Sequence, residues 1–298
     1  MANTFFDSVN KEDTFTFIPW EEQTIANDFM FSKVMSNPEL SKELLRRIFP
    51  QLNIEKVEDI EIQKTLKNYY VNKGVRLDVY VSDEKGRRYD IEMQMTSNQN
   101  IRKRSRYYAS MLDANDLLKG KDYDSLSDTY IVFICTFDLF GQGYHKYSFK
   151  NICMENNNIL LNDGAERLFL NTEGTRDDVD AELKKFLDFV KGREVEPDDF
   201  LKRLKQAVEE AKTVETWRDE YMTFNEIERR GFLQGEAIGE AKGEAKGRAK
   251  GKAEGEADRK AKDISIIKEM VLNGQISEDT ASLIISNFSK PSLENEQN

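Results

Sequence analysis

The stretch GVRLDVYVSDEKGRRYDIEMQM, residues 74–95, decides the fold. Both of its halves alternate apolar and polar side chains, which is typical of strands with one face on a core. The segment DEKGR between them, residues 83–87, consists of turn residues, so the halves are predicted to pair as an antiparallel β-hairpin. Pairing that is symmetric about this turn places Asp78 opposite Glu92.

Strand alternation also predicts which side chains share a face. Asp78 and Tyr80 lie on one face of the first strand, and the other face carries Leu77, Val79 and Val81. In the second strand Glu92 and Gln94 share a face, and the other face carries Ile91, Met93 and Met95. Two acids are thereby predicted to lie on neighbouring strands.

Asp78 and Glu92 have two interpretations in this pairing. Directly opposed side chains have Cβ atoms about 4.5–5.5 Å apart, and like charges at that spacing are destabilising. A divalent cation between the carboxylates would offset the repulsion, with water and a substrate phosphate as its other ligands. Alternatively, the polar face of the hairpin meets solvent, where acidic residues are ordinary.

Helices and buried strands flank the hairpin. Residues 24–36 have helical spacing of apolar side chains, and Asn37-Pro38 ends that helix and starts another, which stops at Pro50. The run TYIVFICTF, residues 129–137, is typical of a strand buried on both faces. The other predicted elements are a basic helix at about 100–119, strands at 146–154 and 166–171, and helices over 180–230.

Composition excludes several classes of protein. The chain of 298 residues has 44 Lys and Arg against 55 Asp and Glu, so its net charge of −11 argues against non-specific coating of nucleic acid. A single His and two Cys exclude a zinc centre, and any metal chemistry must use carboxylates and a hard cation. No apolar run could span a membrane and no signal peptide is recognised, so we expect a cytoplasmic protein with reduced thiols.

Residues 231–262 form a low-complexity repeat with glycine at every fourth position from Gly231 to Gly255. Each Gly costs about 0.8–1 kcal/mol relative to Ala in a helix, which favours a frayed helix or linker. The alternative is a helix whose glycine stripe packs closely on a partner chain. Residues 263–288 resemble two short helices joined at Asn273-Gly274. An acidic second helix makes a packing hairpin a better interpretation than a DNA-reading helix-turn-helix.

Asp78, followed after thirteen residues by Glu92-Met93-Gln94, resembles the signature of the PD-(D/E)XK nuclease superfamily, with Gln in place of Lys. The segments NDFMFSKVMSNPE and RSRYYASMLDANDLLKGKDYDSLSDTYIVFICTFDLFG, the hairpin and the glycine repeat together resemble its transposase-like, or recombination-promoting, branch. That branch commonly has Gln at the position of Gln94. The resemblance covers about residues 20–290.

The resemblance implies an α/β fold with a mixed central sheet flanked by helices, and a Mg²⁺-dependent or Mn²⁺-dependent DNA endonuclease. Asp78 and Glu92 would bind the metal, and the backbone carbonyl of Met93 would add a ligand. Asp28 matches an acid that the superfamily often places on the first helix, although an exposed helix acid is the alternative. Gln94 would orient the attacking water, but it cannot titrate near neutral pH, so we expect slow cleavage.

The basic segment IRKRSRYY, residues 101–108, is the candidate contact to DNA. A helical projection turns Arg104 toward the apolar face and the predicted site, whereas Arg102 and Arg106 face solvent, where DNA backbone could meet them. Tyr107 could stack on a base, but its alternative role is packing.

The predicted organisation has four parts: a nuclease-like core over residues 1–172, a helical extension over 173–230, the repeat over 231–262, and a short helical hairpin with a polar tail over 263–298. The leading hypothesis is a DNA endonuclease associated with recombination or a mobile element. The alternative is a catalytically degenerate nuclease fold that binds DNA or a protein partner. A further hypothesis makes the repeat a homo-oligomerisation device.

Overall fold

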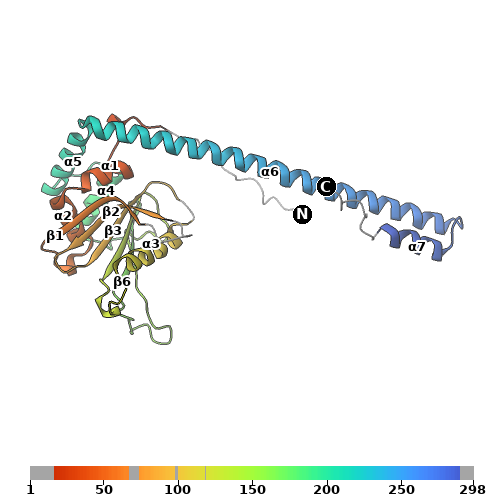
Figure 1. Ribbon diagram of the computed structural model, residues 1–298, viewed down its shortest axis with the longest axis horizontal. Helices are drawn as coiled ribbons and strands as arrows, with labels where there is room; N and C mark the ends of the chain where they lie inside the picture. Colours follow the sequence, from red (N-terminus) through yellow and green to blue (C-terminus); the bar gives the residue numbers. More distant parts are fainter. Residues whose placement is uncertain (1–16, 67–73, 98–99, 118, 289–298) are drawn as a thin grey trace. The chain divides into compact units, whose positions relative to one another are not determined.

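The computed structural model describes residues 17–66, 74–97, 100–117 and 119–288 (Figure 1). The chain divides into two compact units, Thr16–Asn225 and a second unit that contains Glu226–Asn298. The start of the predicted core, residues 1–16, and the polar tail, residues 289–298, lie outside the described residues.

One sheet of six strands forms the centre of the first unit, in the order β1-β2-β3-β4-β6-β5. The β1/β2, β2/β3 and β5/β6 pairs are antiparallel, and the β3/β4 and β4/β6 pairs are parallel. The sheet is therefore mixed. Its strands are β1 (Val57–Leu66), β2 (Val75–Asp83), β3 (Arg88–Gln94), β4 (Thr129–Cys135), β5 (Lys146–Phe149) and β6 (Ala165–Asn171).

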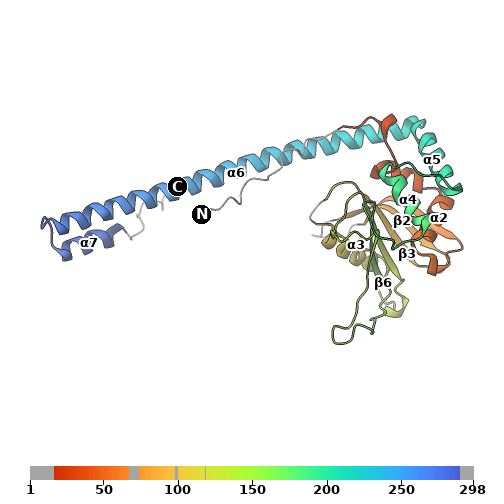
Figure 2. The same ribbon diagram turned by 180° about the vertical axis from the view of Figure 1, so that it is seen from behind.

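Helices cover both faces of this sheet, as Figures 1 and 2 show from opposite sides. The helices α1, α2, α4 and α5 contribute to the core on one face, and α3 contributes to the core on the other. Their bounds are α1 (Asp28–Met35), α2 (Pro38–Ile48), α3 (Ile101–Asp116), α4 (Ala181–Lys191) and α5 (Asp199–Lys212), with short 3₁₀ turns at Trp20–Glu22, Pro50–Leu52 and Tyr123–Ser125.

Capping residues explain where the first helices begin. The Asn27 side chain accepts a hydrogen bond from Met30 N at the start of α1, which is shorter at its N-terminus than the predicted 24–36. The Asn37 side chain caps α2, and Pro38 occupies its first position as predicted. These caps fix the start of α1, where Asp28 is the first residue.

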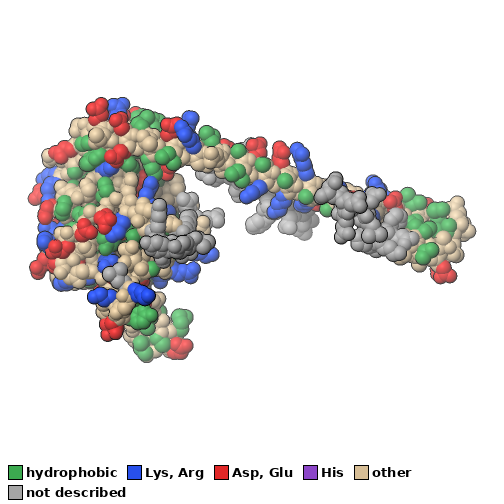
Figure 3. All heavy atoms as spheres, in the orientation of Figure 1, with side chains coloured by type: hydrophobic (Ala, Val, Ile, Leu, Met, Phe, Trp, Pro, Cys, Tyr) green, Lys and Arg blue, Asp and Glu red, His purple; other side chains and the backbone are tan. Residues whose placement is uncertain are grey.

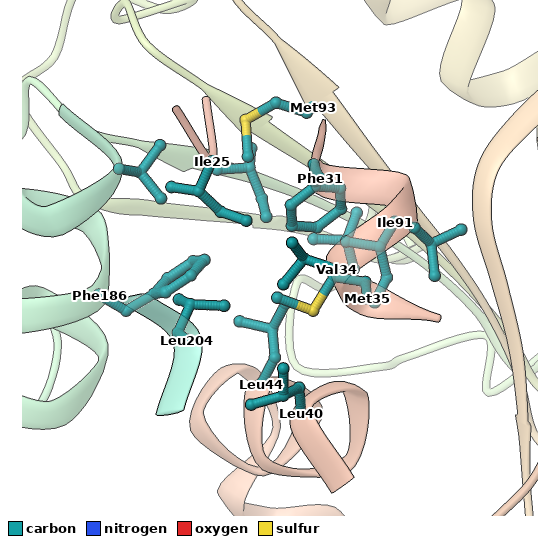
Figure 4. Close-up of a cluster of buried hydrophobic side chains, with 14 of the residues drawn as sticks. Ile25, Phe31, Val34, Met35, Leu40, Leu44, Ile91, Met93, Phe186 and Leu204 are labelled. Atoms are coloured by element: carbon teal, nitrogen blue, oxygen red, sulfur yellow. The ribbon is translucent and has the colours of Figure 1, made fainter. Parts of the chain in front are cut away.

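The larger core lies between the sheet and the four helices on its first face. Figure 4 shows side chains from α1, α2, β3, α4 and α5 converging there, among them Val34, Leu44, Ile91, Phe186 and Leu204. Leu44, Ile91, Phe186 and Leu204 have no exposed surface. Burial of this kind supplies most of the folding free energy, because each fully buried large apolar side chain contributes about 1.5–3 kcal/mol.

The smaller core packs α3 on the opposite face through Ile101, Met111 and Leu112. All seven residues of β4 are buried, as predicted for a strand covered on both faces. The connection from β3 through α3 to the parallel strand β4 is the usual crossover between parallel strands, and it brings the start of α3 near the end of β3.

The helix α6 (Glu215–Leu272) begins in the first unit and runs through the glycine repeat. Its first turns belong to the core, because Tyr221 packs against Trp20 and Phe29, and Lys33 pairs with Glu220. From Gly231 to Gly255 each glycine is exposed. The predicted separate helix before Asn273 is the end of α6, and α7 (Glu278–Phe288) follows.

The segment between β5 and β6 is a hairpin that an Ile152–Leu160 bridge closes. Its exposed apolar side chains include Met154 and Leu161 and contribute green surface in the space-filling view (Figure 3). Within the described residues, no helix is both long enough and apolar enough to cross a membrane.

Candidate active site

Asp78 and Glu92 meet where β2 and β3 separate. The paired residues Val79–Ile91 and Tyr80–Asp90 have the register that the sequence predicts. One step further, Asp78 N donates to Glu92 Oε1 at 2.9 Å, and Met93 N donates to Asp78 Oδ2 at 3.1 Å. Each carboxylate is thus held by a backbone amide of the neighbouring strand, and both are fixed at one place.

The alternation of β2 is interrupted at this place. Leu77 belongs to the core under α3, whereas Val79 and Val81 belong to the core on the other face. The prediction that these three residues share a face is therefore wrong. Opposite the interruption, Gln63 of β1 lies between the partners of Val79 and Leu77 and has φ 51°, a left-handed conformation that non-glycine residues rarely adopt. Local irregularities of this kind re-aim side chains beside functional sites.

A third acid, Asp90, adjoins the pair. Asp90 has no exposed surface, and no amide, hydroxyl or basic side chain of the described residues donates to its carboxyl oxygens. The charge of Asp90 raises the pKa of Glu92. Sequence reasoning did not single out Asp90, although strand alternation from Glu92 places it on the same face.

Burial dominates the electrostatics of these carboxyls. Desolvation raises the pKa of Asp78 well above its usual value, and the charges of Glu92 and Asp28 raise it further. Burial and the neighbouring Asp90 likewise raise the pKa of Glu92, which is 3% exposed. Buried acids whose pKa is raised by one another are typical of sites that bind a cation or move protons.

Asp28 adds a fourth carboxyl from the start of α1. It is half-buried, and its Oδ1 accepts a hydrogen bond from Phe29 N at 2.8 Å. Burial raises its pKa, while the charges of Arg76 and Arg104 lower it. Because Asp28 is half-buried, it is not the exposed helix acid of the alternative interpretation, and its charge raises the pKa of Asp78.

Arg104 of α3 is a cation that hydrogen-bonds to Glu92. Its Nη2 lies 2.6 Å from Gln94 Oε1 and 3.4 Å from Glu92 Oε2. Its guanidinium lies 4.8 Å from the ring centroid of Phe133, and its charge lowers the pKa of Asp28, Asp78, Asp90 and Glu92. The helical projection anticipated that Arg104 turns toward the site, but not its hydrogen bond to Gln94.

A model of the PD-(D/E)XK nuclease family transposases matches residues 25–232. The chain belongs to this family. The match spans the sheet and every acid of the group, and the mixed six-stranded sheet with helices on both faces is consistent with the nuclease-like fold. No curated protein and no solved structure matches the chain.

The carboxylates of Asp78 and Glu92 are oxygen ligands of the kind that a hard cation prefers. Mg²⁺ is usually held by one or two carboxylates, with waters and substrate phosphates as the remaining ligands. In a strand the N–H and C=O of one residue point to the same side, so the Met93 carbonyl points to the β2 side of β3, as the Met93 N–H that donates to Asp78 does. Within the described residues, however, no three Asp, Glu, His or Cys side chains form a preassembled metal cluster.

The remaining predicted DNA-binding residues lie along α3. Arg102 and Arg106 are exposed, and Arg102 also donates to Leu139 O at 2.9 Å and lies over the ring of Phe140. Tyr107 is half-buried and packs against the core under α3, which favours packing over base stacking.

The single histidine, His145, is 2% exposed, and its Nδ1 lies 2.9 Å from Asp178 Oδ1, consistent with a structural role.

Proposed function

We propose that this protein is a divalent-metal-dependent endonuclease that hydrolyses phosphodiester bonds of DNA in connection with recombination or a mobile element. The observation that carries the proposal is the pair of half-buried Asp78 and buried Glu92, each held in place by a backbone amide, with the charge of Glu92 raising the pKa of Asp78. Such a pair is poorly accommodated without a cation, and a bound cation offsets that repulsion. Family membership supports DNA as the substrate.

Asp78 and Glu92 would hold Mg²⁺ or Mn²⁺, and the Met93 carbonyl and Asp28 are the additional ligands that this geometry offers. The bound ion would lower the pKa of a water molecule and polarise the scissile phosphate. Arg104 would bind the phosphate near the acids, while Arg102 and Arg106 would contact the DNA backbone along α3. Tyr107, the candidate for base stacking, is assigned instead to packing.

Nicking of supercoiled plasmid DNA tests this proposal. Wild-type protein should nick with Mg²⁺ or Mn²⁺ and not with EDTA, and the isosteric variants Asp78→Asn and Glu92→Gln should lose the activity. Asp59→Asn is a matched control, because Asp59 is an exposed acid on β1. Equal nicking by Asp78→Asn, Glu92→Gln and wild type would show that these residues are not the metal site.

A second candidate function is a non-catalytic module that binds DNA or a protein partner. Gln94 favours it, because its Oε1 is bound by Arg104 and its Nε2 donates to Thr96 O at 3.0 Å, so both ends of the amide are engaged. A ligand that binds only the folded protein must raise the melting temperature. The absence of a rise with millimolar Mg²⁺ or Mn²⁺, together with DNA binding without cleavage, would favour the module.

The glycine repeat of α6 is a candidate device for homo-oligomerisation. Its glycines are exposed along the helix, with open space where a Cβ would project. Removal of residues 231–298 followed by mass measurement in solution tests this role. An unchanged oligomeric state would exclude it.

A further inference from the structure

The position of the motif lysine is occupied here by Gln94, a neutral residue, while the cation at the acids comes from another element. Hydrolysis of a phosphodiester develops negative charge on the phosphate oxygens, and a preorganised cation stabilises it. Among the described residues, Arg104 is the basic side chain that hydrogen-bonds at the acids, to Gln94 Oε1 and Glu92 Oε2. Arg104 of α3 therefore supplies the positive charge that phosphodiester hydrolysis requires near the acids.

The hydrogen bonds of Arg104 described above engage one of its three nitrogens. A guanidinium carries five N–H donors, and Nη2 makes both hydrogen bonds described above. Its Nε is buried without a partner among the described atoms, and its side chain is 28% exposed. The pair with Glu92 is long, at 3.4 Å, whereas the bond to Gln94 is short, at 2.6 Å. Gln94 is therefore the group that sets the position of Arg104.

A lysine at residue 94 would not serve this purpose. Lysine has three donors and no acceptor, so it could not accept a hydrogen bond from Arg104 and would repel it. Glutamine supplies the acceptor oxygen without adding a further negative charge to the four acids. The ring of Phe133 lies 4.8 Å from the guanidinium and holds it from another side.

We infer that Arg104 contacts the scissile phosphate in place of the motif lysine, and that Gln94 is its positioning residue rather than a group that orients water. This inference rests on the proposed nuclease function. It assigns the substrate contact to Arg104 of α3 and the positioning of Arg104 to Gln94 of β3.

A double-mutant cycle distinguishes the two roles of Gln94. Arg104→Met should slow nicking about 100-fold, as loss of a charge-stabilising donor does. Gln94→Leu should slow it about 10-fold, as loss of a hydrogen bond to a charged group does. If Gln94 acts through Arg104, the double variant is no slower than Arg104→Met alone. A multiplicative loss of about 1,000-fold would mean that Gln94 acts independently, and would overturn the inference.

Rescue of nicking by a second substitution is a further test, because a purely structural role of Gln94 would not predict it. In Arg104→Met protein the additional change Gln94→Lys should recover at least 10-fold of the rate, because lysine then supplies the missing charge. In protein that retains Arg104, Gln94→Lys should slow the reaction. Lys205→Met, an equal charge change at an exposed position of α5, is the matched control, and melting temperatures confirm folding.

DNA affinity separates failure of this inference from failure of the proposed function. If wild-type protein does not nick, the nuclease proposal fails, and the same cycle is measured as binding of a labelled duplex in Ca²⁺. Arg104→Met should then weaken binding, with Gln94→Leu giving no further loss. Independence of both nicking and binding from Arg104 overturns the inference.

Discussion

Replacement of Glu92 by Gln should stabilise the metal-free protein at pH 8. Glu92 is 3% exposed, and burial and then Asp90 raise its pKa. Glutamine has nearly the same shape, keeps an oxygen to accept the hydrogen bond from Asp78 N, and offers N–H donors to the buried carboxyl of Asp90. The substitution therefore removes a desolvated charge without opening a cavity.

The magnitude follows from the cost of a buried group that is unsatisfied or repelled, about 1–3 kcal/mol. In a unit of this size, 1 kcal/mol shifts the melting temperature by about 2–4 °C, so a gain of about 2 kcal/mol corresponds to about 4–8 °C. A lost interaction with Arg104, 3.4 Å from Glu92 Oε2, opposes the gain only weakly because that contact is long.

The pH dependence gives this prediction its sign. Because folding raises the pKa of Glu92, its contribution to stability is fully present below the pKa of the unfolded chain and is lost as pH rises through the folded-state pKa. Wild type and Glu92→Gln should therefore be about equally stable at pH 4, and the variant should be more stable at pH 8.

Urea unfolding of both proteins in EDTA at the two pH values measures this difference. Glu55→Gln is the control, because Glu55 is exposed. A variant that is no more stable than wild type at pH 8, or a gap that is equal at pH 4 and pH 8, would refute the assignment of a repelled, desolvated carboxylate.

Three other predictions concern the scaffold. Leu204→Ala should lower the free energy of unfolding by about 3–5 kcal/mol because Leu204 has no exposed surface, whereas the exposed control Lys205→Ala should change little in the same urea titration. Gly164→Ala should be clearly more destabilising than Gly86→Ala. Both glycines have positive φ, but a Cβ at Gly164 would lie 2.4 Å from Asp128 Oδ1, whereas the space at Gly86 is open; equal melting temperatures would contradict this reasoning. Removal of residues 231–298 should leave the thermal midpoint of the core unchanged, because the first compact unit ends at Asn225, and a lower midpoint by circular dichroism would show that the repeat stabilises the core.

Strand periodicity was sufficient to predict the hairpin and its register, because each side of the turn alternates and one face must be buried. The buried run of β4 and the caps of α1 and α2 were equally readable, since they depend on neighbours in sequence. The interruption of the alternation at Asp78 could not be predicted from the sequence. It accompanies a left-handed backbone conformation at Gln63, and glutamine gives no local signal for positive φ.

The interior of the candidate site depended on contacts between elements. The acids Asp78 and Glu92 follow from the hairpin alone, but the bond between Gln94 and Arg104 depends on how α3 packs on the sheet. Helix propensity did not decide whether the glycine repeat is a frayed linker or a continuous helix. In the structure a single helix, α6, runs through it. Asp90 could have been found, because alternation from Glu92 leads directly to it.

The contact between Tyr221 and Ile18 has a practical consequence. Tyr221 Oη donates to Ile18 O at 2.8 Å, so the two ends of the first unit lie side by side. Units whose ends meet tolerate circular permutation and insertion into other proteins. Phe17 and Asn225 should thus be joinable by a short linker, with new termini opened at the exposed Asn156 and Asn157 of the β5–β6 hairpin. The first unit could then be inserted into another protein without the part of α6 that follows Asn225.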